Sequence, residues 1–216
     1  MKASWIALFL SICSVASAQR NAANRTIPAT QPSPENFFVK LLHPLEPEKF
    51  TPLTGKARFH EYFRNTFGPY ALVRDAAAAG MRQAQNSPHE WGGGAQGYGQ
   101  RFASALGTSL AQNSIAYGLS AALHEDNRYF GSGKTGIRRA LYAALGSFRA
   151  RRDDGTVGFS YSNVGGVVGG SVTSLAWAPP SWRTASHVGE TIGFTFAGQA
   201  AFNIFREFLP DLLHHP

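Results

Sequence analysis

The run AQGYGQRFASALGTSLAQNSIAYGLSAALHEDN, residues 95–127, decides the fold class of this chain. Its larger apolar residues recur at every fourth position, at Tyr98, Phe102, Leu106 and Leu110. This spacing lines one face of an α-helix, where we expect the side chains to form part of the core. The sequence therefore predicts one long helix from Gly94 to about Asn127, with a bend at Gly107.

Further helices are expected on both sides of this one. Thr54 is a typical N-cap for a helix that reaches Phe67, and the Gly68-Pro69 pair separates it from the next helix, which stops before Pro88. More helices are predicted over residues 137–148, 163–177 and 183–209. Val157–Tyr161 alternates like a strand but is too short to carry a sheet. The predicted fold is all-α, a Gly/Ala-rich bundle of five to six helices with an extended Pro-rich N-terminal arm and one short strand-like segment.

The first 18 residues are typical of a secretory signal peptide. Lys2 supplies a positive start, residues 5–12 form a short apolar run, and Ala16-Ser17-Ala18 fits the small-residue cleavage rule. We expect cleavage after Ala18, which also removes Cys13, the only cysteine. Residues 19–52 are rich in proline and are expected to form an arm or linker, which leaves residues 53–216 as the helical domain. The predicted location is the periplasm or cell envelope.

The charge of the chain favours acidic partners. Charged residues make up only 15% of the sequence, but the formal net charge is +7. Anionic lipid or envelope polymers are the expected partners of an arginine-rich segment, with Arg138, Arg139, Arg149, Arg151 and Arg152. Export and the lack of a basic motif interleaved with aromatic residues argue against nucleic acid. The sequence leaves the oligomeric state open.

Small residues recur at a spacing of four in two predicted helices, as Gly165/Gly169, Gly166/Gly170, Gly189/Gly193 and Gly193/Ala197. Such stripes let helix backbones approach closely, both in membranes and in soluble bundles. Gln112, Asn113 and Glu190 interrupt the apolar stretches, so we favour a water-soluble or membrane-peripheral bundle over a spanning one.

Familiar catalytic and cofactor motifs are incomplete in this sequence. Gly131-Ser-Gly-Lys-Thr-Gly136 matches a dinucleotide-binding pattern, but a predicted helix precedes it where a strand is needed. Ser120 lies within a helix and not at the strand-to-helix turn of a hydrolase nucleophile. Each His-Glu pair lacks the second histidine of a zinc-protease helix. The sequence therefore predicts no cofactor and no metal site, and it favours a protein that is not an enzyme.

Two polar clusters remain as candidate catalytic sites. One holds His124, Glu125 and Asp126, in which His124 is expected to point inward as a general base, and the other is His89-Glu90. The alternative interpretation is a pair of hydrogen-bonded networks that hold the bundle together, because buried polar groups must be paired whatever their function. Candidate binding residues are Trp91, Tyr98, Arg101, Arg128 and Tyr129.

Four spaced motifs follow one another along the chain. They are Glu90-Trp-Gly-x-Gly-Ala-x-Gly-Tyr-Gly-x-Arg-Phe102, Glu125-Asp-x-Arg-Tyr-Phe130, Tyr161-Ser-Asn163 and Asn203-x-x-x-Glu-Phe-x-Pro-Asp211. Together they resemble a group of exported bacterial proteins with no known activity, over the range from about Phe63 to Leu212. The resemblance implies export and brings no cofactor, substrate or catalytic residue.

Three functional hypotheses follow from the sequence. The leading one is an exported cell-envelope protein, a helical structural or interaction module that is peripheral to a membrane. The second is a hydrolase or small-ligand site in which His89, Glu90, Glu125 and Asp126 converge on one cleft with His124. The third is a membrane-inserted helical oligomer that uses the glycine stripes.

Overall fold

The computed structural model describes residues 50–213, with side chains as far as Asp211. All of these residues belong to one compact unit. The predicted signal peptide and residues 19–49 of the predicted arm lie outside the described residues.

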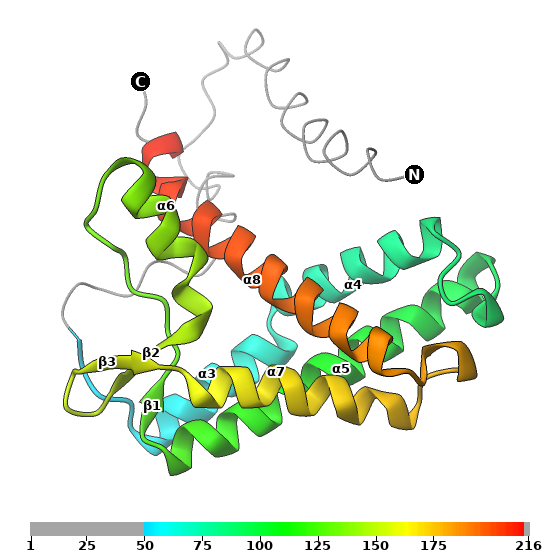
Figure 1. The fold of residues 1–216 in the computed structure, drawn as a ribbon, viewed down its shortest axis with the longest axis horizontal. Coiled ribbons are helices and arrows are strands. Elements are labelled where there is room, and N and C mark those ends of the chain that lie inside the picture. Colours follow the sequence, from blue (N-terminus) through cyan, green and yellow to red (C-terminus); the bar gives the residue numbers. More distant parts are fainter. Residues whose placement is uncertain (1–49, 214–216) are drawn as a thin grey trace, which may run out of the picture. The chain divides into compact units, whose positions relative to one another are not determined.

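The described part of the chain is mostly helical and carries one small antiparallel sheet (Figure 1). The α-helices are α3 (Gly55–Phe67), α4 (Pro69–Ala84), α5 (Gly94–Ala122), α6 (Gly136–Ala144), α7 (Tyr161–Thr173) and α8 (Ala185–Leu213). Short 3₁₀ turns are η2 (His89–Trp91), η3 (Gly146–Phe148), η4 (Ser174–Ala176) and η5 (Pro180–Trp182). The strands are β1 (Glu125–Asp126), β2 (Arg149–Arg152) and β3 (Val157–Phe159). The predicted helical fold class is confirmed.

The first helix boundaries follow the local signals in the sequence. Thr54 is the N-cap of α3, and its side chain accepts a hydrogen bond from the backbone N–H of Ala57 at 3.3 Å. Gly68 ends α3 by donating its backbone N–H to the carbonyl of Arg64, and Pro69 is the first residue of α4. Proline suits a first helical position because the N–H that it lacks has no partner within the helix.

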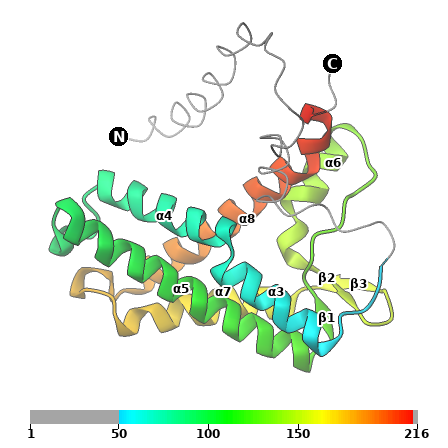
Figure 2. The ribbon, with the colours of Figure 1, turned by 180° about the vertical axis from the view of Figure 1, so that it is seen from behind.

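Helices α5 and α7 approach each other closely through glycine (Figures 1 and 2). A Cβ atom added to Gly166 would lie 2.6 Å from the Cβ of Ala116, and one added to Gly170 would lie 2.4 Å from Cγ of Gln112. Both distances are far below van der Waals contact, so no side chain fits there. In Figure 2, α3, α4 and α5 lie in front of α7 and α8.

The long central helix is shorter than predicted. It runs without interruption past Gly107 and ends at Ala122, because His124 takes a positive φ of 54° that turns the chain into β1. In β1, Glu125 pairs with Arg152 of β2, and β2 pairs in turn with β3, both antiparallel. The expectation that Val157–Tyr161 carries no sheet is therefore wrong, since two strands from elsewhere in the chain complete a sheet around its first three residues.

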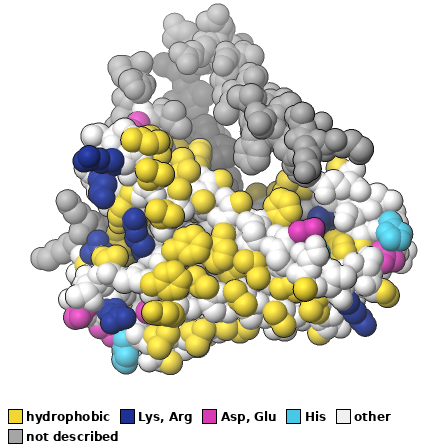
Figure 3. Space-filling model, in the orientation of Figure 1, with side chains coloured by type: hydrophobic (Ala, Val, Ile, Leu, Met, Phe, Trp, Pro, Cys, Tyr) yellow, Lys and Arg dark blue, Asp and Glu magenta, His cyan; other side chains and the backbone are white. Residues whose placement is uncertain are grey.

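The interior of the described unit is polar to an unusual degree. The largest fully buried side chains are Arg101, Glu125, Thr66, Asp126, Ser160, Ser162 and Ser171. Large apolar side chains are instead exposed on several helices, among them Phe59, Phe63, Val73, Ile137, Leu141, Val172 and Phe194. Figure 3 shows hydrophobic side chains gathered over the face that α6, α7 and α8 form. The predicted core stripe is only partly buried, because Tyr98 and Leu110 remain 37% and 38% exposed.

Within residues 50–213, none of the helices combines the length and the apolar character that crossing a bilayer requires.

Candidate functional site

The N-terminal end of α5 is organised around one buried guanidinium group. Arg101 is fully buried and donates hydrogen bonds to the carbonyl oxygens of Ser87, Pro88 and Gly92 at 2.8–2.9 Å. It also donates to Oε1 of Gln83 at 2.5 Å. Three carbonyl oxygens from the α4–α5 connection and one amide oxygen from α4 thus converge on one side chain, so Arg101 holds this loop in place. Arg101 was expected to bind a ligand, but in this structure none of its atoms is exposed.

The glycines before Arg101 give that guanidinium its room. A Cβ added to Gly97 would lie 2.7 Å from Nη1 of Arg101 and 2.5 Å from the carbonyl oxygen of Gly92. Gly92 and Gly94 have positive φ angles of 60° and 68°, which glycine adopts without steric cost. The Gly-rich segment is thus explained by the loop that surrounds Arg101.

His89 and Glu90 lie on the surface of the same loop. The His89 side chain is 76% exposed, and its Nδ1 lies 3.5 Å from Oε2 of Glu90. Glu90 accepts a hydrogen bond from the backbone N–H of Ser181 at 3.2 Å, and hydrogen bonding to Ser181 lowers the pKa of its carboxyl group. The pair therefore links η2 to η5 at the surface.

An aromatic cluster lies beside this pair. The rings of Trp91 and Trp182 meet edge to face at 5.3 Å, His187 stacks on Trp182 at 4.2 Å, and the Arg82 guanidinium lies 4.7 Å from the Trp182 ring centre. Burial lowers the pKa of Arg82 and of His187. Tyr98 donates its hydroxyl to the carbonyl of Ala76 at 3.2 Å. Trp91 and Tyr98 thus make contacts within the protein, although Tyr98 remains 37% exposed.

The other polar cluster lies beyond the C-terminal end of α5, where Glu125 caps α7. The Glu125 side chain is buried and accepts hydrogen bonds from the backbone N–H groups of Tyr161 and Ser162, at 3.3 and 2.8 Å. It also accepts the Ser162 hydroxyl at 2.5 Å. A carboxylate at a helix N-terminus satisfies free N–H groups and complements the helix dipole. Arg58 of α3 donates to the carbonyl oxygens of Ser120 and Glu125, which fixes this junction from the other side.

Asp126 and Arg128 form a buried ion pair next to that cap. The Arg128 guanidinium donates from Nε and Nη2 to the Asp126 carboxylate at 2.8–3.1 Å, and the Arg128 backbone N–H adds a further bond at 2.9 Å. Arg128 also donates to the carbonyl of Thr51 at 2.9 Å. Both oxygens of Asp126 are therefore engaged by Arg128.

His124 points away from this network. Its side chain is 72% exposed, and its Nδ1 lies 2.8 Å from Oδ2 of Asp153. The prediction that His124 faces inward is wrong, because α5 ends at Ala122 and the helical periodicity that placed His124 inward no longer applies.

Tyr129 connects this region to α8 by a hydrogen bond to Glu207. The Tyr129 hydroxyl donates to Oε2 of Glu207 at 2.6 Å, while Oε1 of Glu207 accepts from the backbone N–H and the hydroxyl of Ser132. Arg139 donates to the same carboxylate at 3.3 Å. Burial acts to raise the pKa of Glu207, but the hydrogen bonds from Ser132, Tyr129 and Arg139 outweigh it and leave that pKa lowered. Burial raises the pKa of Tyr129, and its bond to Glu207 adds to the rise.

The structure does not bring the two predicted clusters together. His89 and Glu90 adjoin the start of α5, whereas His124 and Asp126 follow its end, and α5 has 29 residues. At 1.5 Å per residue, the helix alone separates them by roughly 44 Å. The predicted common cleft is therefore wrong. Among the described residues, no three His, Cys, Asp or Glu side chains are grouped as metal ligands.

Sequence reasoning overlooked the residues that complete these networks. Glu207 belongs to the fourth motif, which implies no role for it, and the partners Arg58 and Ser162 carry no signal of their own in the sequence. All three lie far along the chain from the residues that they bind, so only folding reveals the pairing.

Comparisons of the chain with protein-family models, with curated proteins and with solved structures gave no match.

Proposed function

We propose that this chain is an exported cell-envelope protein whose helical unit is a non-enzymatic structural or interaction module that lies at a membrane surface. One observation carries the proposal, namely the inverted distribution of side chains in residues 50–213. Arg101, Glu125 and Asp126 are among the largest fully buried side chains, while Ile137, Phe194 and other large apolar side chains are exposed.

The inverted distribution supports a membrane surface for a physical reason. Exposed apolar patches beyond a few hundred Å² are rare in monomeric soluble proteins and mark interaction sites. The α5–α7 contact relies on glycine and serine, and many of the larger apolar side chains remain exposed. Those side chains are then available for an apolar partner outside the protein.

The polar clusters support a structural role over catalysis. The carboxylates of Glu125, Asp126 and Glu207 each accept bonds from donors of the same unit, which fix a helix end or a loop. A general base or metal ligand needs a lone pair that faces a substrate or an ion. His89 and His124, which do have exposed rings, lie at opposite ends of α5.

Vesicle co-sedimentation of the exported, processed chain tests the proposal. We expect the protein to pellet with vesicles at low salt, more strongly when they contain anionic lipid, because loss of Lys2 lowers the formal net charge from +7 only to +6. Absence from the pellet with both neutral and anionic vesicles would remove the membrane part of the proposal. Ovalbumin, an acidic soluble protein, serves as the control for trapping in the pellet.

A further inference from the structure

Helix α6 presents its apolar side to the outside of the unit. Ile137, Leu141 and Leu145, which we call the α6 stripe, are 73%, 54% and 49% exposed. They follow one another at a spacing of four, so at about 100° per residue they share one side of the helix. Ala143 lies on roughly the opposite side and is fully buried. The helix is amphipathic, but its small residues and not its large apolar ones face the protein.

The inward side of α6 is fixed by contacts with α8. Arg139 pairs with Glu207 at 3.3 Å and also with Asp211, and its guanidinium lies 4.4 Å from the centre of the Phe208 ring. The Arg139 side chain is only 19% exposed. Arg139 therefore belongs to the α6–α8 contact, and we do not include it among the arginines that bind a partner. Its interactions with α8 orient α6 so that the α6 stripe faces outward.

Basic side chains flank the stripe. Lys134 precedes α6 and Arg138 lies within it, and both are exposed. Among residues 50–213, no carboxylate lies within ion-pairing distance of either. The carboxylates that contact α6, Glu207 and Asp211 of α8, are already paired with Arg139.

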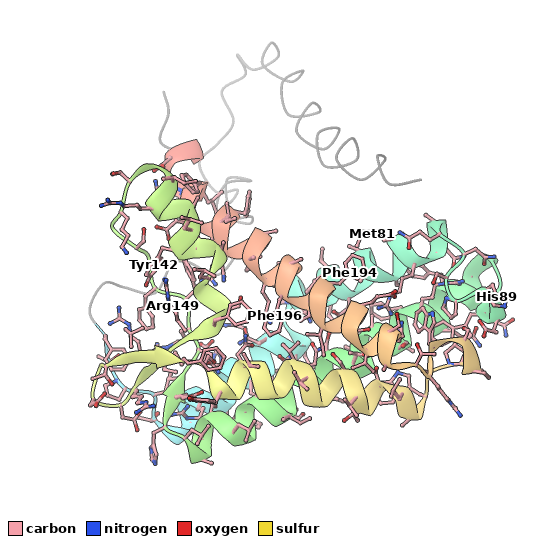
Figure 4. All side chains as sticks on the ribbon, in the orientation of Figure 1. Met81, His89, Tyr142, Arg149, Phe194 and Phe196 are labelled. Atoms are coloured by element: carbon pink, nitrogen blue, oxygen red, sulfur yellow. The ribbon has the colours of Figure 1, made fainter. Side chains whose placement is uncertain are left out.

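An amphipathic tyrosine joins this surface to the sheet. Lys134 lies 5.1 Å and the Arg149 guanidinium 4.5 Å from the Tyr142 ring centre. Figure 4 places Tyr142 and Arg149 between α6 and the sheet, and Figure 3 shows basic side chains at the border of the hydrophobic area there. Aromatic rings with one polar end are typical of the membrane interface.

We propose that the α6 stripe enters the surface of an anionic lipid bilayer, with Lys134 and Arg138 at the lipid phosphates. The inference rests on the proposed function and names the surface and the lipid class. The combination of aliphatic and basic side chains selects this partner. A soluble polyanion would use the cations alone, and a second copy across a two-fold axis would bring Lys134 and Arg138 against like charges.

Two double variants of the processed chain separate the contribution of the basic side chains to membrane binding from that of the apolar stripe. Lys134→Gln with Arg138→Gln is expected to weaken partitioning to vesicles of phosphatidylglycerol and phosphatidylcholine by roughly 25-fold, at about fivefold for each cation. Ile137→Ser with Leu141→Ser is expected to weaken it by about 100-fold, at about tenfold for each side chain withdrawn from the bilayer. Phe63→Ser is the matched control, since Phe63 is 54% exposed on α3, and it should leave partitioning unchanged. Circular dichroism checks that each variant is folded.

A fluorescent label distinguishes insertion from surface attraction. The sole cysteine is Cys13, in the predicted signal peptide, so Ile137→Cys supplies a unique site in the processed chain for an environment-sensitive dye. We expect a blue shift at position 137 on adding anionic vesicles, and none for a dye on Phe63→Cys.

Each outcome bears on the proposal differently. Wild-type binding that the α6 variants leave intact, or that Phe63→Ser weakens equally, overturns the inference and keeps the proposed function. Binding of soluble polyphosphate through Lys134 and Arg138 with no spectral shift at position 137 identifies an anionic polymer and overturns it too. Dimerisation that depends on the α6 stripe, without response to lipid, assigns the stripe to a second copy. No vesicle binding by the wild type removes both proposals.

Discussion

Arg101 shows at the level of a single residue how this protein uses polar groups in its interior. The guanidinium is buried without a carboxylate partner among the described residues, and its charge is met by carbonyl and amide oxygens. Removing it leaves these acceptors buried and unpaired, which is costly because each hydrogen bond to a charged group contributes about 1.5–3 kcal/mol.

We therefore expect Arg101→Ala to lower the free energy of unfolding by about 3–5 kcal/mol. Arg101→Lys should restore only a small part, because a lysine ammonium cannot reproduce the planar fork of donors. Urea denaturation followed by circular dichroism measures both. The exposed Arg138→Ala is the control, with an expected change within about 0.5 kcal/mol. A change of that size for Arg101→Ala would mean that the loop before α5 does not depend on this side chain.

Glu207 is expected to make the unfolding free energy of the protein depend on pH in the acidic range. Its pKa is lower in the folded state than its ordinary value of 4.5. A lowered folded pKa contributes stability above the unfolded pKa, and that contribution is lost as the pH falls through the folded value. The unfolding free energy should therefore decline as the pH falls below about 4.5.

Glu207→Gln is expected to flatten that decline and to lower stability at pH 7 by about 1–3 kcal/mol, because the hydrogen bonds to a charged acceptor are lost. Chemical denaturation at several pH values between 3 and 7 gives the slope. Asp211→Asn serves for comparison, since Asp211 pairs with the same arginine but its side chain is 52% exposed, and it should change stability by less than about 1 kcal/mol. Equal slopes for wild type and Glu207→Gln would contradict the assignment.

At the scale of helices, the two glycine stripes differ in how they are packed. On α7, Gly170 lies against the backbone of α5, where an added Cβ would be 2.5 Å from the Gln112 nitrogen. On α8, no atom of the described residues outside the helix's own backbone lies within 4 Å of the Cβ position of Gly189 or Gly193. The sequence spacing is the same, but one stripe forms a helix contact and the other is open.

Gly170→Ala is accordingly expected to destabilise the protein by about 1–3 kcal/mol through overpacking. Gly193→Ala should stabilise it by about 0.5–1 kcal/mol, because alanine has the higher helix propensity. Thermal and urea unfolding of this matched pair decide the matter. Destabilisation by Gly193→Ala of the same size would show that the α8 stripe is covered in solution.

At the scale of the whole molecule, export and the exposed apolar side chains belong to one proposal. The signal peptide is expected to be removed after Ala18, so the exported protein should begin at Gln19 and contain no cysteine. Intact-mass measurement of protein recovered from the cell envelope tests this, and a thiol-reactive reagent should add no mass. An intact mass that retains residues 1–18, or a fatty-acid adduct on Cys13, would replace cleavage after Ala18 with another form of attachment.

The sequence by itself determined the helical class, the first helix boundaries and the presence of closely packing glycines. These are local properties, because N-capping by Thr54, the Gly68-Pro69 break and a four-residue spacing depend on neighbours in the chain. It also indicated that the polar clusters would be hydrogen-bonded networks as one of two alternatives, since buried polar groups must be paired.

Only the tertiary structure decided which faces are covered. Whether Gly170 or Gly193 is packed, whether Leu141 points in or out and whether His124 continues α5 all depend on residues distant in the chain. Glu125 is buried because the N-terminus of α7 lies over it. The large apolar side chains of α6 face outward because Arg139, on its inner side, pairs with Glu207 and Asp211 of α8. Periodicity marks the faces of a helix but not their partners, so these outcomes follow from long-range packing.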